Sequence, residues 1–442
     1  MLLGKTFVSL QQIALSKIAV AVFRDPEVSD FIKNRGTHFS TWPSKEIEAI
    51  FDPILHNQIK KADKLEFIKV EDNFWHVRQF THIIFEGEDK ILVLPNKQWE
   101  TLIRQKVSTL PIPPSISKDV LALLRFMLIQ TDKWINDHYV ILRSIRGFTD
   151  RLHWTHDAKI ARRKTAKALI DDNDVDIGDR FELACMYCFQ EDVFTLWGCM
   201  NAHYKKGLQR SLRTVALKWT EYLKMENVLD WEEIARISRC NPLGLHVFFP
   251  KLTEEGRLQW LSFTLKRGWI DHDELQFCLS KLNQNQQAEL LKNFPLQILE
   301  TFLEWPALRE FLDVAQILLP YLSLEQFRDL LRLILSEKIE LGSNDFNYIP
   351  LIRELWGKSP SGYKEFVKKD EIFCSLKLII EHDPLQPFPP AVLMHNPEST
   401  SLEFRSSGTL FVFYKNAFKF EGLNSEVMDR YRRIDMTGIS EK

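Results

Sequence analysis

The chain has 442 residues, a formal net charge of −2, 45% hydrophobic residues and 27% charged residues. The apolar fraction excludes an intrinsically disordered chain, and the balanced charge argues against a protein that coats nucleic acid. With 16 glycines, about half the usual share, turn-rich β folds and glycine-rich phosphate loops are also disfavoured. We therefore expect an all-α fold, in a chain long enough for two or more packed units.

Residues 6–23 carry apolar side chains at spacings of three and four, which predicts an amphipathic helix that ends before Asp25-Pro26. Polar residues interrupt this segment too often for a secretory signal, and no run approaches the length of a membrane span. Six cysteines are too few for a disulfide scaffold. We expect a cytoplasmic protein without a membrane partner; a nuclear location is left open.

Residues 27–70 suggest further short helices, and the segment 72–94 allows two interpretations. A helix, which is slightly favoured, would place Phe74, Val77 and Phe80 on one face. The alternative is a small β-hairpin near 80–94.

The stretch Leu110-Pro-Ile-Pro-Pro114 is the clearest linker, because proline interrupts helices and pushes the preceding residue into extended backbone. It divides an N-terminal helical unit, 1–109, from a helical array, 117–380. We expect Ser117 to be the N-cap of the strongly apolar helix that follows.

Between 140 and 220, blocks of basic and acidic residues alternate. The basic blocks contain Trp154, Tyr204 and Trp219, which suits phosphate contact and base stacking. The acidic loop from Asp171 to Asp179 opposes this, so we expect solvated helix faces and no nucleic-acid partner.

Between 245 and 340, three segments share one pattern: a leucine, a capping residue and then a helical apolar spacing. The capping residues are Thr253, Asn283 and Ser323, and the last two form capping boxes with Gln286 and Gln326. The separations are 30 and 40 residues, about one helical hairpin each. This predicts an irregular α-solenoid or helical-hairpin array, in which neighbouring pairs bury each other's apolar faces.

The region 384–442 differs, because five prolines between Pro384 and Pro397 exclude a continuous helix. We expect it to be a Pro-rich segment followed by a non-helical C-terminal extension. Within it, the apolar run 409–414 predicts a small β-hairpin over 402–414.

Cys185, Cys188, Cys199 and His203 form the best metal candidate in the sequence. Spacings of three and four place each pair on one helix face, and three thiolates with one imidazole suit tetrahedral zinc. Buried cysteines in a helical core explain the same residues, and we favour this explanation, with no metal and no cofactor. The familiar catalytic and nucleotide-binding motifs do not occur, so an enzyme is the less favoured class.

One pattern indicates a partner. Ser9-Leu10-x-x-x-Ala14-x-x-x-Ile18 resembles the Elongin-binding helix of the suppressor-of-cytokine-signalling box, and Leu110-Pro111-Ile112-Pro113 is similar to the cullin-choosing half of that box. The resemblance implies that Leu10, with Ala14 and Ile18, binds Elongin B/C in a helix-in-groove mode, while Leu110, Pro111 and Pro113 meet a cullin.

The leading functional hypothesis is an intracellular, helical-repeat-like scaffold that binds other proteins and performs no catalysis. The first alternative, implied by the resemblance, is a substrate-receptor subunit of an Elongin/cullin-type ubiquitin ligase. The second is a zinc-binding protein or enzyme that uses the Cys/His cluster.

Overall fold

The computed structural model describes residues 9–35, 64–70, 77–86, 95–138, 141–142, 148–208, 214–225, 228–239, 241–340, 346–383, 386, 388, 401–406 and 409–414. These residues are mostly helical, so the prediction of an all-α fold is confirmed, with one small sheet as the exception. Within these ranges, no helix combines the length and the apolar character that crossing a membrane requires.

The first half of the chain contains the following elements: α1 (Leu10–Phe23), α2 (Pro26–Arg35), β1 (Lys64–Val70), β2 (Val77–Glu86), α4 (Pro95–Ser108), α5 (Pro114–His138), the 3-10 turn η3 (Phe148–Arg151), α6 (Arg162–Asp171), α7 (Ile177–Met186), α8 (Gln190–Cys199), α9 (Ala202–Leu208) and α10 (Thr214–Met225).

The second half contains these: α11 (Trp231–Ile237), α12 (Leu245–Phe248), η4 (Phe249–Lys251), α13 (Glu254–Arg267), α14 (His272–Leu279), α15 (Gln284–Asn293), α16 (Pro295–Phe302), η5 (Ala307–Glu310), α17 (Phe311–Leu318), η6 (Leu319–Tyr321), α18 (Leu324–Leu333), the π-helix η7 (Ile334–Glu340), α19 (Tyr348–Lys358), α20 (Ser361–Val367), α21 (Ile372–Glu381), β3 (Ser401–Ser406) and β4 (Thr409–Tyr414).

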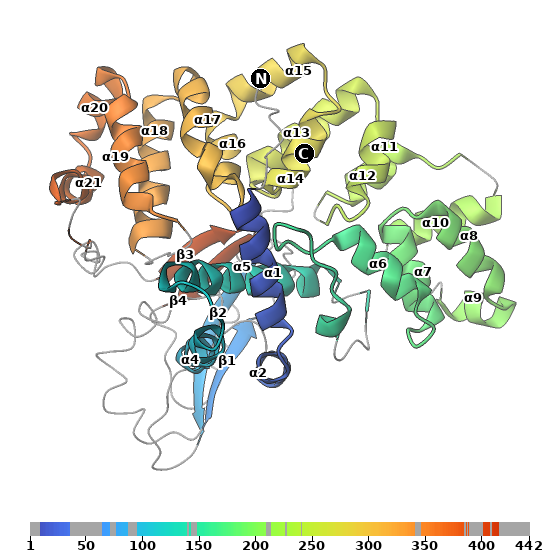
Figure 1. The fold of residues 1–442 in the computed structure, drawn as a ribbon. Coiled ribbons are helices and arrows are strands. Elements are labelled where there is room, and N and C mark those ends of the chain that lie inside the picture. The colour runs from blue at the N-terminus through green and yellow to red at the C-terminus, as the bar shows by residue number, and fades with distance from the viewer. Residues whose placement is uncertain are drawn as a thin grey trace.

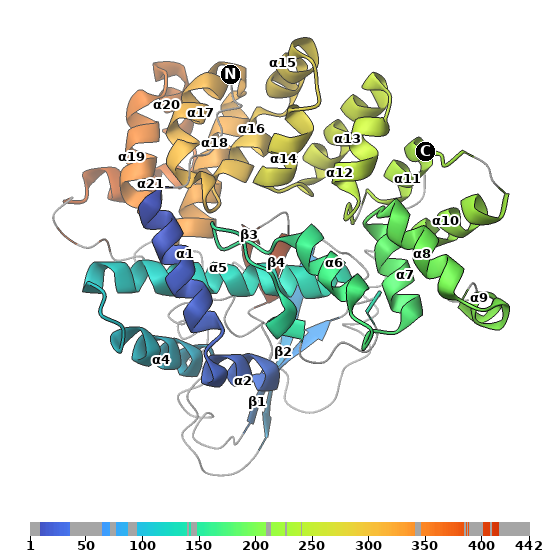
Figure 2. The same ribbon diagram turned by 45° about the vertical axis from the view of Figure 1, so that its right-hand side comes forward.

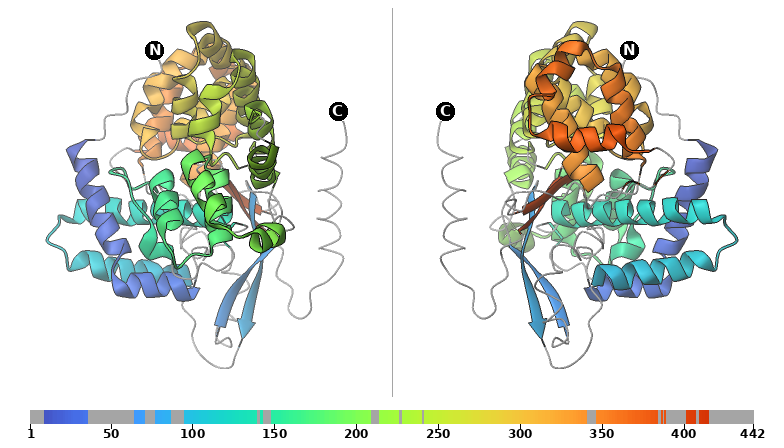
Figure 3. Two further views of the ribbon diagram at one scale, coloured as in Figure 1. Left: turned by 90° about the vertical axis from the view of Figure 1, so that its right-hand side faces the viewer. Right: turned by 90° about the vertical axis from the view of Figure 1, so that its left-hand side faces the viewer.

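The helices from α6 to α21 follow one another along an arc, and the long helix α5 lies beneath it (Figures 1 and 2). Helices of the arc contact the next helix and the next but one: α16 packs on α17 and α18, α17 on α19, α18 on α20 and α19 on α21. Helix α1 crosses α5, whereas α2 and α4 lie on the side of α5 away from the arc (Figures 2 and 3).

The apolar core falls into two clusters. One is built from α1, α2, α4 and α5, and the other extends from the end of α5 through the arc to α21. Helix α5 therefore packs with the helices that precede the proline linker, although it follows that linker in sequence. The division into 1–109, 117–380 and 384–442 stays a prediction.

The loop between η3 and α6 joins these two clusters. The Trp305 indole N–H donates to the carbonyl of Asp157 over 2.7 Å, and the Lys159 ammonium pairs with the Asp273 carboxylate at 2.7 Å. Trp154 packs against both clusters. This loop thereby ties the arc to the helices around α5.

The N-terminal helix exposes part of the face that carries its apolar spacing. Leu10 is 85% exposed and Ala14 is also exposed, whereas the polar Gln12 and Ser16 are buried. Ser9 caps the helix in a capping box with Gln12, which accounts for one buried polar side chain. The helix is apolar on nearly every side, so its sequence did not determine which side would meet α5.

The sheet has the order β1-β2-β4-β3. Strand β1 pairs with β2 in antiparallel fashion and β4 pairs with β3 likewise, whereas β2 and β4 run parallel, with Val77 opposite Leu410. The sheet therefore joins strands that are more than 300 residues apart in sequence.

The predicted hairpin over 402–414 is confirmed, because β3 and β4 pair with Ser406 opposite Thr409. The favoured helix over 72–94 is wrong, since β2 occupies 77–86. In the alternative hairpin near 80–94, the strand over 81–85 falls within β2, and the partner expected at 90–94 lies outside the described residues. Strand β2 pairs with β1, in a region expected to be helical. The β-branched and aromatic residues of 81–85 favour a strand, and the pairing decides between two patterns that both fit the sequence.

The three predicted caps of the array are confirmed. Thr253 accepts a hydrogen bond from the backbone N–H of Gly256, and Asn283 and Ser323 form complete capping boxes. The expected cap at Ser117 is wrong, because α5 begins earlier, at Pro114. Proline fits the first position of a helix, where its missing N–H would have no intrahelical partner.

Candidate peptide-binding groove

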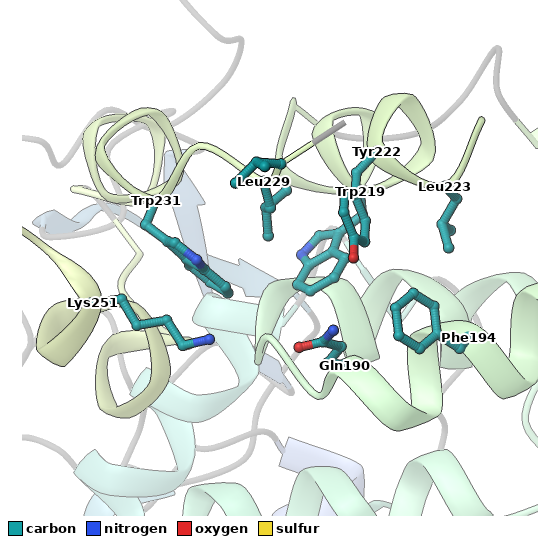
Figure 4. A pocket seen from close by; sticks show the side chains of 9 residues that line it. Gln190, Phe194, Trp219, Tyr222, Leu223, Leu229, Trp231 and Lys251 are labelled. Carbon is teal, nitrogen blue, oxygen red and sulfur yellow. The ribbon is translucent and has the colours of Figure 1, made fainter. Parts of the chain in front are cut away.

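A surface pocket of about 510 Å³ lies between α8, α10, α11 and η4 (Figure 4). Aromatic and aliphatic side chains dominate its lining, which consists of Gln190, Phe194, Trp219, Tyr222, Leu223, Val228, Leu229, Trp231 and Lys251. We call this pocket the aromatic groove. Its size is in the range of cavities that bind small molecules or a few side chains of a peptide.

Trp219 forms the floor of the aromatic groove. It is fully buried, and its indole N–H donates to the carbonyl of Cys185 over 3.0 Å. Its ring meets those of Tyr222 and Trp231 edge to face, with centroids 5.9 and 6.1 Å away. Because the hydrogen bond and both edge contacts fix the ring, the floor is formed before any ligand arrives.

The rim of the aromatic groove is apolar and open to solvent. Phe194 is 41% exposed and Val228 is 94% exposed. The centroid of the Phe194 ring lies 6.1 Å from that of Tyr222. The rings of Trp231, Trp219, Tyr222 and Phe194 therefore form a row that extends from the floor to the rim. Exposed apolar groups of this kind mark interaction surfaces when they lie together around a pocket.

Lys251 closes one end of the aromatic groove. Its ammonium lies 4.2 Å from the centroid of the Trp231 ring, in a cation–π contact. The backbone nearby is fixed, because Glu232 of α11 accepts hydrogen bonds of 2.9 Å from both the N–H and the hydroxyl of Thr253. Figure 4 shows the Lys251 side chain pointing into the pocket between Trp231 and Gln190.

The four candidate metal ligands do not form a metal site. Cys185 and Cys188 are buried, whereas Cys199 and His203 are exposed. No group of three or more metal-binding side chains occurs among the residues that the structure describes, and these four belong to them. Burial raises the pKa of the Cys188 thiol to about 12, which leaves it protonated and unreactive at neutral pH.

The residues of the resemblance lie on two separate parts of the surface. Leu10 and Ala14 lie on the exposed face of α1, and Ile18 is half-buried. Pro111 and Pro113 are exposed and Leu110 is half-buried, in the connection between α4 and α5. Figure 2 shows the start of α1 above α5 and this connection beyond the end of α5, so the two halves lie apart.

A buried polar cluster between α5, α6 and α7 is the other concentration of titratable groups. Arg162 pairs with Asp137, and His138 contacts the Tyr187 hydroxyl at 2.9 Å. Burial alone would raise the pKa of Asp137, but the charge of Arg162 more than offsets this, so the pKa lies below its ordinary value. The Asp137, His138 and Tyr187 side chains are buried, and the contacts of the cluster connect α5 to the arc.

Sequence reasoning missed most of the aromatic groove. The sequence indicates Trp219 only as a base-stacking candidate, and the spacing of Trp219, Tyr222 and Leu223 is also that of an ordinary core helix. The row of rings arises because α8, α10 and α11 meet, which a helical period within one segment does not reveal. Comparisons with protein-family models, curated proteins and solved structures found no match to this chain.

Proposed function

We propose that the protein is an intracellular, non-catalytic scaffold whose helical array binds a short peptide segment of a partner protein in the aromatic groove. The observation that carries this proposal is the row of rings from Trp231 through Trp219 and Tyr222 to the exposed Phe194. Aromatic side chains supply most of the binding energy in many interfaces. A pocket floor whose side chains are already ordered lowers the entropic cost of binding.

The stacking of the arc supports a scaffold role. From α16 to α21, contacts between a helix and its next but one neighbour are those expected of a solenoid of helical hairpins. We therefore propose an irregular α-solenoid and place its peptide site at the α8–α11 end.

The test selects random dodecapeptides, displayed on a library, against the purified full chain. Val228→Glu places a charge at the mouth of the groove and should abolish binding of the selected peptides. Leu378→Glu changes a residue that is 44% exposed on α21 and serves as the matched control. The proposed site would be contradicted if the selected peptides bind Val228→Glu with the same affinity as Leu378→Glu and the unaltered chain.

The ubiquitin-ligase adaptor is the second candidate, and the 85% exposure of Leu10 favours it. An exposed leucine at the start of a helix is available for a helix-in-groove contact. Co-purification with Elongin B/C should be lost on Leu10→Asp and kept on Gln11→Asp, since Gln11 is the exposed neighbour. Absence of co-purification of the unaltered chain at micromolar concentrations would dispose of this candidate.

A further inference from the structure

We infer that the aromatic groove binds an extended peptide that carries a carboxylate beside its apolar residues, and that Lys251 binds this carboxylate. The inference rests on the proposed function and specifies its ligand.

Charge is the first argument. Among the described lining residues, Lys251 is the one with an ionisable side chain that is charged at neutral pH. It is exposed, and within the described part of the chain its ammonium contacts the Trp231 ring and no carboxylate. An ammonium has three N–H donors, and contact with a ring face leaves donors for an anion. A carboxylate at the Trp231 end of the groove would therefore gain a charge-assisted hydrogen bond.

The same lysine argues against a cationic ligand. Aromatic pockets recognise ammonium groups by presenting open ring faces. Here the chain's own ammonium already lies over Trp231, so a second cation would have to displace it or approach a like charge.

Acidic residues beside the groove argue against a nucleic acid. Glu191 follows Gln190 in the first turn of α8, Glu221 precedes Tyr222, and Asp230 precedes Trp231; all three are exposed. A nucleic-acid strand would bring one phosphate per nucleotide past these carboxylates. A peptide with a single carboxylate at the Trp231 end brings one negative charge to the groove, and that charge lies against the Lys251 ammonium.

The spacing of the rings argues for an extended chain. Successive centroids in the row are 6.1, 5.9 and 6.1 Å apart. An extended strand rises about 3.3 Å per residue, so side chains on one face recur about every 6.6 Å. Trp219 is buried beneath the row, so the rings that a peptide can meet are those of Trp231, Tyr222 and Phe194. The step of 6.1 Å between Tyr222 and Phe194 matches alternate residues of an extended peptide, with the acidic residue at the Lys251 end.

The peptide selection described above also tests this inference. We expect the recovered sequences to share apolar or proline residues at alternate positions, next to Asp or Glu. A fluorescein-labelled peptide of that sequence and its Glu→Gln counterpart are then titrated by anisotropy. Lys251→Gln should weaken binding of the acidic peptide about three- to tenfold and binding of the neutral peptide less than about twofold. Lys224→Gln, an exposed lysine on α10 outside the lining, should change neither.

The outcomes distinguish the inference from the proposed function. The inference alone would be overturned if the recovered peptides need Val228 for binding but lack an acidic residue or carry a basic one in its place. Apolar residues at spacings of three and four, which indicate a helical peptide, would overturn it as well. Stronger binding of poly(U) RNA than of any peptide, sensitive to Lys251→Gln, would overturn it in favour of a nucleic acid. Recovery of no peptide that depends on the groove would overturn the proposed function itself.

Discussion

Gly244, at the start of α12, lies where no side chain fits. A Cβ atom at this position would come within 2.6 Å of the Cys188 sulfur and 2.9 Å of the Met186 carbonyl oxygen. Gly198, near the end of α8, has nothing within 4 Å of its would-be Cβ atom. The two glycines thus have different physical reasons to be glycine.

Gly244→Ala should lower the free energy of unfolding by about 1–3 kcal/mol, because backbone or a buried sulfur must move. Gly198→Ala should raise it by about 0.5 kcal/mol, because alanine is the better helix former. Urea denaturation followed by circular dichroism measures both. Equal and small effects of the two substitutions would contradict the close approach at Gly244.

His138 is a buried histidine whose ring is fully engaged. Its Nδ1–H donates to the Trp134 carbonyl over 2.7 Å, and its Nε2 accepts from the Tyr187 hydroxyl at 2.9 Å. Burial and the Arg162 charge lower its pKa from the ordinary 6.5 to about 4. The unfolded chain therefore takes up a proton at a higher pH than the folded chain does, and the stabilising contribution is lost as pH falls from 6.5 toward 4.

We expect His138→Gln to lower the free energy of unfolding by about 1–3 kcal/mol at neutral pH, since two buried hydrogen bonds change. The gap between the two proteins should shrink as pH falls through this window. Burial raises the pKa of Glu274 to about 7, so protonation of this residue stabilises the folded chain as pH falls. Glu274 is present in both proteins, so its contribution cancels from the difference between their free energies of unfolding. A pH-independent gap in denaturant titrations would contradict the assignment.

At the scale of the element, the helices of the array are closed by residues that a sequence displays directly. Asn283 and Ser323 each accept a hydrogen bond from a backbone N–H three residues later, and Gln286 and Gln326 return the bond. The sequence contains every partner of these bonds within four residues, which is why the caps could be predicted. The start of α5 is different, because Pro114 occupies the first position of the helix, and the sequence pattern predicts a later start at Ser117.

Asn283→Ala and Ser323→Ala should each lower the free energy of unfolding by about 1 kcal/mol. Because the two caps lie at different helices, their effects should add in the double variant. Gln284→Ala, an exposed residue beside the first cap, should have little effect. Thermal denaturation of the unaltered chain and the four variants is the measurement. A loss at Gln284→Ala as large as at Asn283→Ala would exclude the capping explanation.

At the scale of the whole molecule, one ion pair connects α5 to the arc. Arg162 begins α6 and pairs with Asp137 at the end of α5, whose side chain is 6% exposed. Removing one partner of a buried pair leaves the other charge without compensation.

Arg162→Met should lower the free energy of unfolding by about 3–5 kcal/mol, or leave the chain unable to fold at 37 °C. Asp137→Asn combined with Arg162→Met should recover part of the loss, because neither member of the pair is then left as a charge without its partner. Guanidinium titrations of the single and double variants measure the coupling. A double variant that is less stable than the sum of both single effects predicts would contradict this account.

The sequence by itself determined the helical class, the caps of the array and the β3–β4 hairpin, because each depends on residues a few positions apart. Only the tertiary structure decided which face of α1 is exposed, that β2 pairs with β1 and β4, and that α8, α10 and α11 enclose a row of aromatic rings. The physical reason is that these features arise from contacts between distant segments. In a helix that is apolar on most sides, the neighbouring elements decide which face is buried. In a segment with both helical and strand spacing, they decide which secondary structure forms.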